Sequence, residues 1–329
     1  MESSGCPIPL VSMTRPKSSR AGTAWRRRCR ERIGRLRDRV ISPRTLDSYK
    51  RAAKRYLEFC LHSLGRFPRS TREVDRYMSG YVEHVWEEGD PTSWAQTVVS
   101  AMTHFEPELR QELHGTRRLL KAWGRLENCD RATPLPTEYA MALAGVALER
   151  RQVRLAVALM VAFHAMLRTG EILTLQVCHF VMPLAAGPVV LALEETKCSQ
   201  RRGIKAESVV LTDPTLIGYL RVVLPRLRPG ERLYGGSGYQ FREDVRSLCY
   251  LARLPAANWR PYSLRRGGAT AHFLEFGSLD RTAVRGRWTS VQTARIYIDE
   301  GVATLAQLIA TDNQRARIQH LARLVPNPQ

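Results

Sequence analysis

The stretch PYSLRRGGATAHFLEFGSLDRTAVRGRWTSVQTARIYID (261–299) sets an arginine, a tryptophan and a tyrosine at intervals in a basic segment. A helix-compatible run follows Arg265, and a turn at Gly277 leads to a second short run with Trp288 and Tyr297. Arginine offers a planar fork of donors that fits phosphate oxygens, indole has one N–H donor, and a tyrosine hydroxyl can act as a nucleophile. Each residue alone would more often be a packing or surface residue, so order and spacing carry the interpretation.

An upstream segment fits the same chemistry. The apolar run LAVALMVAF (155–163) predicts a buried helix, and Arg168 follows shortly after it. A buried arginine is costly without a partner, and Glu171 can hold its guanidinium. Taken alone, this would be a structural ion pair.

The segment VVLALEETKCSQRRGIKAESVVL (189–211) places two β-branched runs around a polar turn, which predicts a β-hairpin. Lysine is scarce in this arginine-rich chain, yet Lys197 and Lys205 both lie here. A lysine carries a titratable ammonium, which arginine cannot supply. The alternative is ordinary solvated charge on a hairpin.

Together these segments resemble the tyrosine recombinases, the phage-integrase family. Its signature is an arginine in a Leu-Arg-x-x-Glu context, a hairpin lysine, a His-x-x-Arg box, a His or Trp, and the nucleophilic tyrosine. In chain order the matching residues are Arg168 with Glu171, Lys197, Arg265, Trp288 and Tyr297. The departure is Tyr262, which stands where the family has the histidine of the box.

This departure bears on proton handling. A tyrosine hydroxyl can donate a hydrogen bond, but its unperturbed pKa near 10 makes it a poor base at neutral pH. His272 is expected on the following helix in a structural role.

The resemblance implies a mechanism without metal or cofactor. Tyr297 would attack a DNA phosphate, form a 3′-phosphotyrosyl bond and release a 5′-hydroxyl. The resemblance also implies that the phosphate is bound by Arg168, Arg265, Trp288 and Tyr262, and that Glu171 orients Arg168. Lys197 would protonate the leaving oxygen. Lys205 is the alternative proton donor, or else it contacts DNA. The implied partners are double-stranded DNA and further copies of the chain in a homo-tetramer.

Composition supports a polyanionic partner. The 329 residues carry a formal net charge of +20, with a pI of about 10.3. Nucleic acid is favoured over a membrane, because no apolar run approaches the roughly 18 residues that a spanning helix needs. The 7 cysteines are scattered without a CxxC pair, which favours reduced thiols and no zinc site. No secretory signal is expected, because the N-terminus lacks an apolar core.

The chain divides into four predicted parts: a basic arm (1–42), a helical core-binding domain (43–128), a linker (129–136) and a catalytic domain (137–329). The core-binding domain should hold helices in the run 42–65 and at 72–88, 92–105 and 108–127. The first should start with Ser42 as cap and Pro43 at the first position, and its apolar face should carry Leu46, Tyr49, Ala53, Tyr56, Leu57 and Cys60. Its candidate DNA-facing residues are Arg44, Lys50, Lys54 and Arg55.

In the catalytic domain we expect Thr137 to cap the first helix, a strand near 174–182, and helices from Pro214 to about 224 and over 239–253. One or two short helices should follow Tyr297. They would dock onto a neighbouring protomer, as the resemblance implies, or pack within their own chain. The expected fold class is mainly α with a small β-sheet: a helical core-binding (SAM-like) domain followed by a tyrosine-recombinase catalytic domain.

Three functions remain open. The first is a site-specific recombinase or integrase of a mobile element. The second is a DNA-binding protein of the same fold that has lost catalysis, which Tyr262 favours. The third is a type IB topoisomerase, whose extra clamp domains do not fit in this length. The arginine-rich composition and Tyr262 resemble recombinases of eukaryotic mobile elements, which implies a nuclear location; a bacterial or phage origin would imply the cytoplasm.

Overall fold

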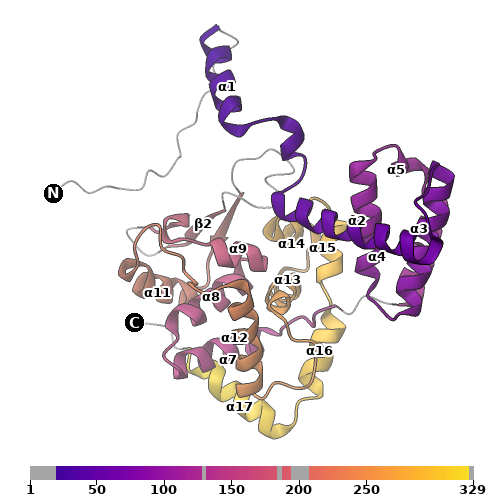
Figure 1. The fold of residues 1–329 in the computed structure, drawn as a ribbon. Coiled ribbons are helices and arrows are strands. Elements are labelled where there is room, and N and C mark those ends of the chain that lie inside the picture. Colours follow the sequence, from indigo (N-terminus) through magenta and orange to yellow (C-terminus); the bar gives the residue numbers. More distant parts are fainter. Residues whose placement is uncertain (1–19, 128–130, 184–186, 194–206, 326–329) are drawn as a thin grey trace. The chain divides into compact units, whose positions relative to one another are not determined.

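The computed structural model describes residues 20–127, 131–183, 187–193 and 207–325. The described residues fold as two compact units, which meet in sequence at 130/131 (Figure 1). Each unit has its own hydrophobic core. The mainly α class with a small sheet is confirmed.

The N-terminal unit is helical throughout its described elements, which are α1 (Arg20–Ile33), η1 (Leu36–Arg39), α2 (Pro43–Leu64), α3 (Thr71–Glu87), α4 (Thr92–Phe105), α5 (Leu109–Glu112) and α6 (His114–Leu126). The predictions for α2, α3 and α4 are confirmed to within one residue. The single helix predicted over 108–127 is wrong. The backbone leaves the helical region at Leu113, with φ −84° and ψ 58°, so α5 ends there and α6 begins.

Helix α2 starts as its sequence predicts. The Ser42 side chain accepts a hydrogen bond from the Thr45 N–H at 3.2 Å, and Pro43 occupies the first helical position. Its innermost face differs from the prediction, because Ala52 is fully buried whereas Leu57 is 39% exposed. The pattern was therefore out of phase by a fraction of a turn.

The Asp75 carboxylate on α3 holds the start of α6. It accepts hydrogen bonds from the N–H groups of Gly115 and Thr116 at 2.8 and 2.9 Å, and from the Thr116 hydroxyl at 2.7 Å. The first N–H groups of a helix lack partners within the helix, and Leu113 at the N-cap provides no side-chain acceptor. Asp75 therefore acts as the cap of α6 from a different helix.

The C-terminal unit contains α7 (Thr137–Glu149), α8 (Val153–His164), α9 (Thr169–Thr174), η2 (Val177–His179), α11 (Pro214–Val223), η3 (Leu224–Arg226), α12 (Gly238–Leu251) and α13 (Pro261–Phe276). Residues 155–163 of α8 are all buried, as the apolar run predicted. Thr137 is the first residue of α7 and Pro136 its N-cap, so the predicted threonine cap is wrong.

A small antiparallel sheet completes this unit, with β1 (Phe180–Val181), β2 (Val189–Leu193) and β3 (Glu207–Leu211) in that order. The predicted hairpin is confirmed, with Val190 opposite Val210. The strand predicted near 174–182 is wrong except for its end, because α9 extends to Thr174, η2 occupies Val177–His179, and β1 is limited to Phe180–Val181.

Four helices close the unit: α14 (Leu279–Gly286), α15 (Val291–Tyr297), α16 (Glu300–Leu308) and α17 (Asp312–Arg323). Helix α17, yellow in Figure 1, packs on α7 of its own chain. Ile318 and Leu321 are buried there, and a Cβ at Gly145 would lie 2.0 Å from the Leu321 carbonyl oxygen. Helix α17 therefore shows the arrangement within the chain, and docking of this segment onto a neighbouring protomer stays a prediction.

Across the described ranges, each helix is too short or too polar to cross a bilayer.

Candidate active site

Helix α13 carries two of the predicted residues on one face. It begins at Pro261, earlier than the sequence indicated, and so Tyr262 and Arg265 lie one turn apart within it. Proline fits the first helical position because its φ is already helical and its missing N–H would have no partner there. Tyr262 remains 38% exposed, whereas Arg265 is fully buried.

The Arg265 guanidinium lies against the aromatic rings of Trp288 and Tyr297. Its Nη1 donates to the Met166 carbonyl and its Nη2 to the Gly286 carbonyl at 2.9 Å. Its Cζ lies 4.7 Å from the ring centroid of Trp288 and 5.2 Å from that of Tyr297. Burial and the nearby guanidiniums of Arg168 and Arg287 lower the pKa of Arg265 to about 10, so it stays protonated at neutral pH. The site thus holds a buried cation.

Arg168 is the N-cap of α9, and Glu171 is the third residue of that helix. One Glu171 oxygen accepts from Arg168 Nη1 at 2.7 Å, and the other accepts from the Arg168 backbone N–H at 2.9 Å. The predicted pairing is confirmed. This fixed geometry leaves the Arg168 side chain 21% exposed, so it can still contact a ligand.

Trp288 packs on the ring of Tyr297, with 4.5 Å between the centroids. A Cβ at Gly286 would lie 1.9 Å from a Trp288 ring carbon, so only glycine fits at this position. The Trp288 indole nitrogen is buried and makes no hydrogen bond of ordinary geometry to a described residue, although it lies close enough to the Tyr297 hydroxyl to help lower the pKa of that group. A buried donor without a partner is uncommon in native proteins and indicates a place for an acceptor.

The two site tyrosines are hydrogen-bonded to each other. The Tyr262 hydroxyl donates to the Tyr297 oxygen at 2.5 Å. Burial opposes ionisation of Tyr297, but the hydrogen bond from Tyr262 and the positive charge of Arg265 outweigh it, so the pKa of Tyr297 lies below its ordinary value. Burial and the bond to Tyr297 raise the pKa of Tyr262, so Tyr262 keeps its proton.

His272 does not join this cluster of contacts. Its Nδ1 lies 2.9 Å from the Thr282 hydroxyl, and its ring packs against Phe276. Burial and the charges of Arg285 and Arg281 lower the pKa of His272 to about 4, so it is neutral at neutral pH. This is the structural role expected from the sequence.

Sequence reasoning missed three charged residues at the site: Arg266, Glu207 and Arg287. Arg266 donates to the carbonyls of Ala132 and Tyr297 and pairs with Asp299 at 3.3 Å, so it holds the backbone around Tyr297. The only sequence feature that pointed to Arg266 was its position directly after Arg265 in the stretch 261–299. Glu207 and Arg287 form a buried ion pair with 3.5 Å between Oε2 and Nε, and no local pattern predicts a pair so distant in sequence.

The remaining predicted residues lie elsewhere. Lys197 and Lys205 fall outside the described residues. Arg44, Lys50 and Lys54 are exposed on α2, whereas the Arg55 guanidinium stacks on the Trp94 ring at 4.3 Å. A further exposed basic face was missed on α6, although its spacing of three and four residues could have revealed it; it consists of Arg117, Arg118, Lys121 and Arg125.

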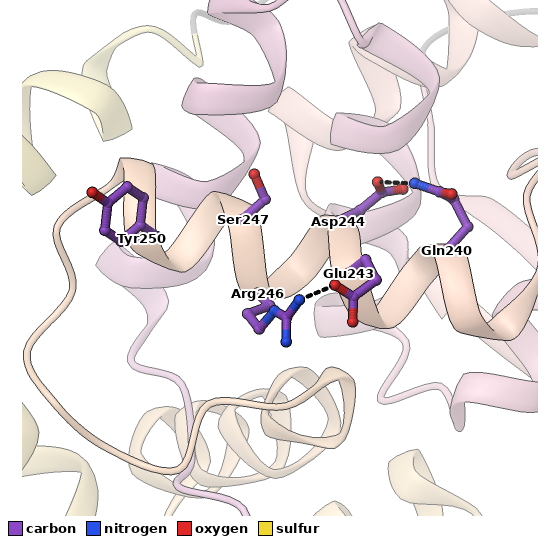
Figure 2. A pocket seen from close by; sticks show the side chains of 6 residues that line it. All are labelled: Gln240, Glu243, Asp244, Arg246, Ser247 and Tyr250. Atoms are coloured by element: carbon purple, nitrogen blue, oxygen red, sulfur yellow. Dashed lines mark hydrogen bonds and ion pairs between the residues drawn. The ribbon is translucent and has the colours of Figure 1, made fainter.

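A separate hollow lies along α12. Figure 2 shows its lining, which comes from this one helix and consists of Gln240, Glu243, Asp244, Arg246, Ser247 and Tyr250. Gln240 donates to Asp244 at 2.9 Å and Arg246 to Glu243, so these polar groups satisfy one another. None of the predicted site residues lines it.

In the described ranges, the His, Cys, Asp and Glu side chains form no group of three or more that could hold a metal ion.

No protein-family model matches the chain, and neither does any curated protein sequence. Solved structures do. The Tn1549 transposon integrase in complex with transposon right end DNA is 12% identical, with a TM-score of 0.60 over 87% of this chain and 96% of that one. The XerH site-specific recombinase in a post-cleavage complex with palindromic difH is 14% identical, with a TM-score of 0.55 over 78% and 76%. A lambda integrase tetramer bound to a Holliday junction is 16% identical, with a TM-score of 0.53 over 84% and 77%. The chain therefore has the tyrosine-recombinase fold.

Proposed function

We propose that this protein breaks and rejoins DNA strands through a 3′-phosphotyrosyl intermediate at Tyr297. The observation that carries the proposal is the position of the Tyr297 hydroxyl, 2.5 Å from a donating hydroxyl and on a ring above the buried Arg265. A nucleophile with a lowered pKa beside buried cations suits attack on an anionic phosphodiester. The fold shared with integrases and recombinases supports the same reaction.

The proposed reaction begins with ionised Tyr297. Because the pKa of Tyr262 is raised, Tyr262 serves as a hydrogen-bond donor and not as the base, and the Tyr297 proton passes to solvent. The tyrosinate oxygen then bonds to phosphorus, and the bond from phosphorus to the 5′-oxygen breaks. The leaving oxygen takes a proton, for which Lys197 remains the proposed donor. One ester bond replaces another, so a 5′-hydroxyl can reverse the step.

Three side chains near Tyr297 would bind the phosphate, and the rings of Trp288 and Tyr297 that cover the fully buried Arg265 must shift to admit it. Arg265 commits two of the five N–H groups of a guanidinium to backbone carbonyls and keeps the others for a ligand. Arg168 adds a second guanidinium, and the unpartnered indole N–H of Trp288 a third donor. Preorganised donors of this kind typically contribute about 3 kcal/mol each to transition-state stabilisation.

Double-stranded DNA is the proposed substrate. The exposed cations of α2 and of the α6 face offer phosphate contacts outside the tyrosine site. The neighbouring structures are described as DNA complexes, and one as a tetramer on a Holliday junction. We propose that this chain likewise acts as a homo-tetramer on DNA.

The test is a search for covalent adducts on nicked duplexes with random sequence around the nick. The nick lies a few nucleotides 3′ of the candidate phosphates, so that the short fragment with the 5′-hydroxyl diffuses away and cannot rejoin. The reaction is stopped in denaturant, with Tyr297→Phe alongside. We expect DNA linked to the peptide that contains Tyr297. Adducts that persist in Tyr297→Phe would assign the nucleophile elsewhere, and DNA binding with no adduct would favour a protein that has lost catalysis.

A further inference from the structure

Arg287 occupies a backbone conformation that its residue type disfavours. It caps α14 immediately before Trp288, with φ 59° and ψ 39°. This left-handed region is open to glycine, whereas a side chain there is strained. The side chain is also 4% exposed and charged. Strain and burial together indicate that its contacts compensate for both.

These contacts join three segments of the C-terminal unit. Arg287 Nη1 donates to the Ala165 carbonyl after α8 at 3.0 Å, and Nη2 donates to Glu171 Oε2 on α9 at 2.8 Å. Its Nε lies 3.5 Å from Glu207 Oε2 at the start of β3. Glu171 is buried and Glu207 is largely so, with side chains 8% and 9% exposed.

Glu171 is therefore shared between two arginines. If Arg168 were its only counter-ion in this dry site, the carboxylate would cancel most of the positive field that Arg168 offers to a ligand. Arg287 takes part of that negative charge, while Glu207 balances Arg287. Three guanidiniums and two carboxylates leave the buried cluster of Arg168, Arg265, Arg287, Glu171 and Glu207 with one net positive charge. A phosphodiester carries one negative charge.

We propose that Arg287 is a positioning residue that holds Glu171 so that Arg168 remains available to bind the phosphate. The inference rests on the proposed function, because it concerns the phosphate site of that reaction. It makes a specific claim, namely that Arg287 acts through the pair of Glu171 and Arg168 and not merely as the counter-ion of Glu207.

The test measures the dissociation constant of inorganic tungstate, an oxyanion probe of the phosphate site, by calorimetry on the full chain. The main variant is Arg287→Gly combined with Glu207→Gln. Glycine relieves the left-handed φ, and glutamine avoids an unpaired carboxylate at position 207; circular dichroism confirms that the variant is folded at the temperature of the binding measurement. Of the two described side chains that donate hydrogen bonds to Glu171, Arg168 is then the one left. We expect binding to weaken about tenfold, as for loss of one charged hydrogen bond.

A cycle with Glu171→Gln gives the decisive comparison. If Arg287 acts by holding Glu171, the variant with all three substitutions binds tungstate no more weakly than Glu171→Gln alone. Losses that multiply would overturn the inference, as would wild-type affinity in the Arg287→Gly and Glu207→Gln variant. Arg285→Met is the matched control, because within the described ranges the hydrogen bonds of Arg285 go to the carbonyls of Val210 and His164, so the substitution should leave the affinity unchanged.

The assay contains no DNA, so it separates this inference from the proposed function. A protein that forms no adduct at Tyr297 but shows the expected cycle refutes the function and retains the role of Arg287. A protein that forms the adduct but shows losses of tungstate affinity that multiply supports the function and refutes the role of Arg287. A wild type that does not bind tungstate overturns the inference.

Discussion

Replacing Tyr262 with phenylalanine removes one hydroxyl and should change how cleavage depends on pH. The Tyr262 hydroxyl donates to the Tyr297 oxygen at 2.5 Å and helps to keep the pKa of Tyr297 below its ordinary value. Without this donor the tyrosinate is less stable, so the pKa of Tyr297 rises. Where Tyr297 is mostly protonated, the rate follows its ionised fraction and falls. At high pH both proteins are ionised, and their rates converge.

The magnitude follows from the strength of one hydrogen bond. A bond to an ionised group contributes about 1.5–3 kcal/mol, and because Tyr262 is 38% exposed, water can replace part of it. The lower end of that range corresponds to about a tenfold change in an ionisation equilibrium. We therefore expect cleavage at neutral pH to be about tenfold slower in Tyr262→Phe.

The assay is the single-turnover cleavage rate across a pH series, on a duplex recovered from the adduct search. NMR of isotopically labelled tyrosine follows the ionisation of Tyr297 directly and needs no DNA. Tyr250→Phe is the control, because Tyr250 is 83% exposed on α12. Profiles of wild type and Tyr262→Phe that superimpose, or a loss that is equal at every pH, would refute the reasoning.

Three further predictions concern stability. Burial opposes ionisation of Glu171, but Arg287 and the backbone and guanidinium of Arg168 outweigh it and lower its pKa below 4.5. A carboxyl group whose pKa is lower in the folded protein stabilises the fold at pH values above its unfolded pKa. This stabilisation is lost as the pH falls through the pKa of the folded state. Glu171→Gln should therefore unfold more easily above about pH 4.5, with a difference from wild type that shrinks in acid; unfolding by denaturant across pH checks this, and a constant difference would contradict it. Gly145→Ala should lower the free energy of unfolding by about 1–3 kcal/mol, because its Cβ would meet the Leu321 carbonyl. Gly301→Ala, with nothing within 4 Å of its Cβ, is the control, and equal effects of the two would argue against the α7–α17 contact. Asp75→Ala should destabilise α6 by about 2 kcal/mol through loss of its cap, and faster amide exchange confined to the N-terminal unit would show it.

Part of the geometry of the candidate site could be predicted because it is encoded locally. The pair of Arg168 and Glu171 lies within one helical turn, so short spacing determined their contact. The hairpin followed from its β-branched runs and is confirmed. Helix starts were predictable where a side chain caps its own helix, as at Ser42.

The misses share a physical cause, since each depends on contacts between distant segments. Asp75 caps α6 from α3, and no sequence window reveals a cap supplied by another helix. The ion pair of Arg287 and Glu207 brings together a turn and a strand end. The Tyr262–Tyr297 bond likewise depends on how α15 packs on α13, so the sequence could identify both residues but not their contact.

The packing of α17 on α7 has a consequence for synthesis of the protein. Tyr139 on α7 donates to the Ala306 carbonyl, and Arg317 on α17 pairs with Glu149, so the first helix of this unit needs partners made more than 160 residues later. At about 5–20 residues per second, a ribosome takes on the order of 10 s or more to cover that interval. Until then the small-residue surface around Gly145 has no partner helix. The nascent chain should depend on chaperones during this period, and its tyrosine site can become fully ordered only late in translation.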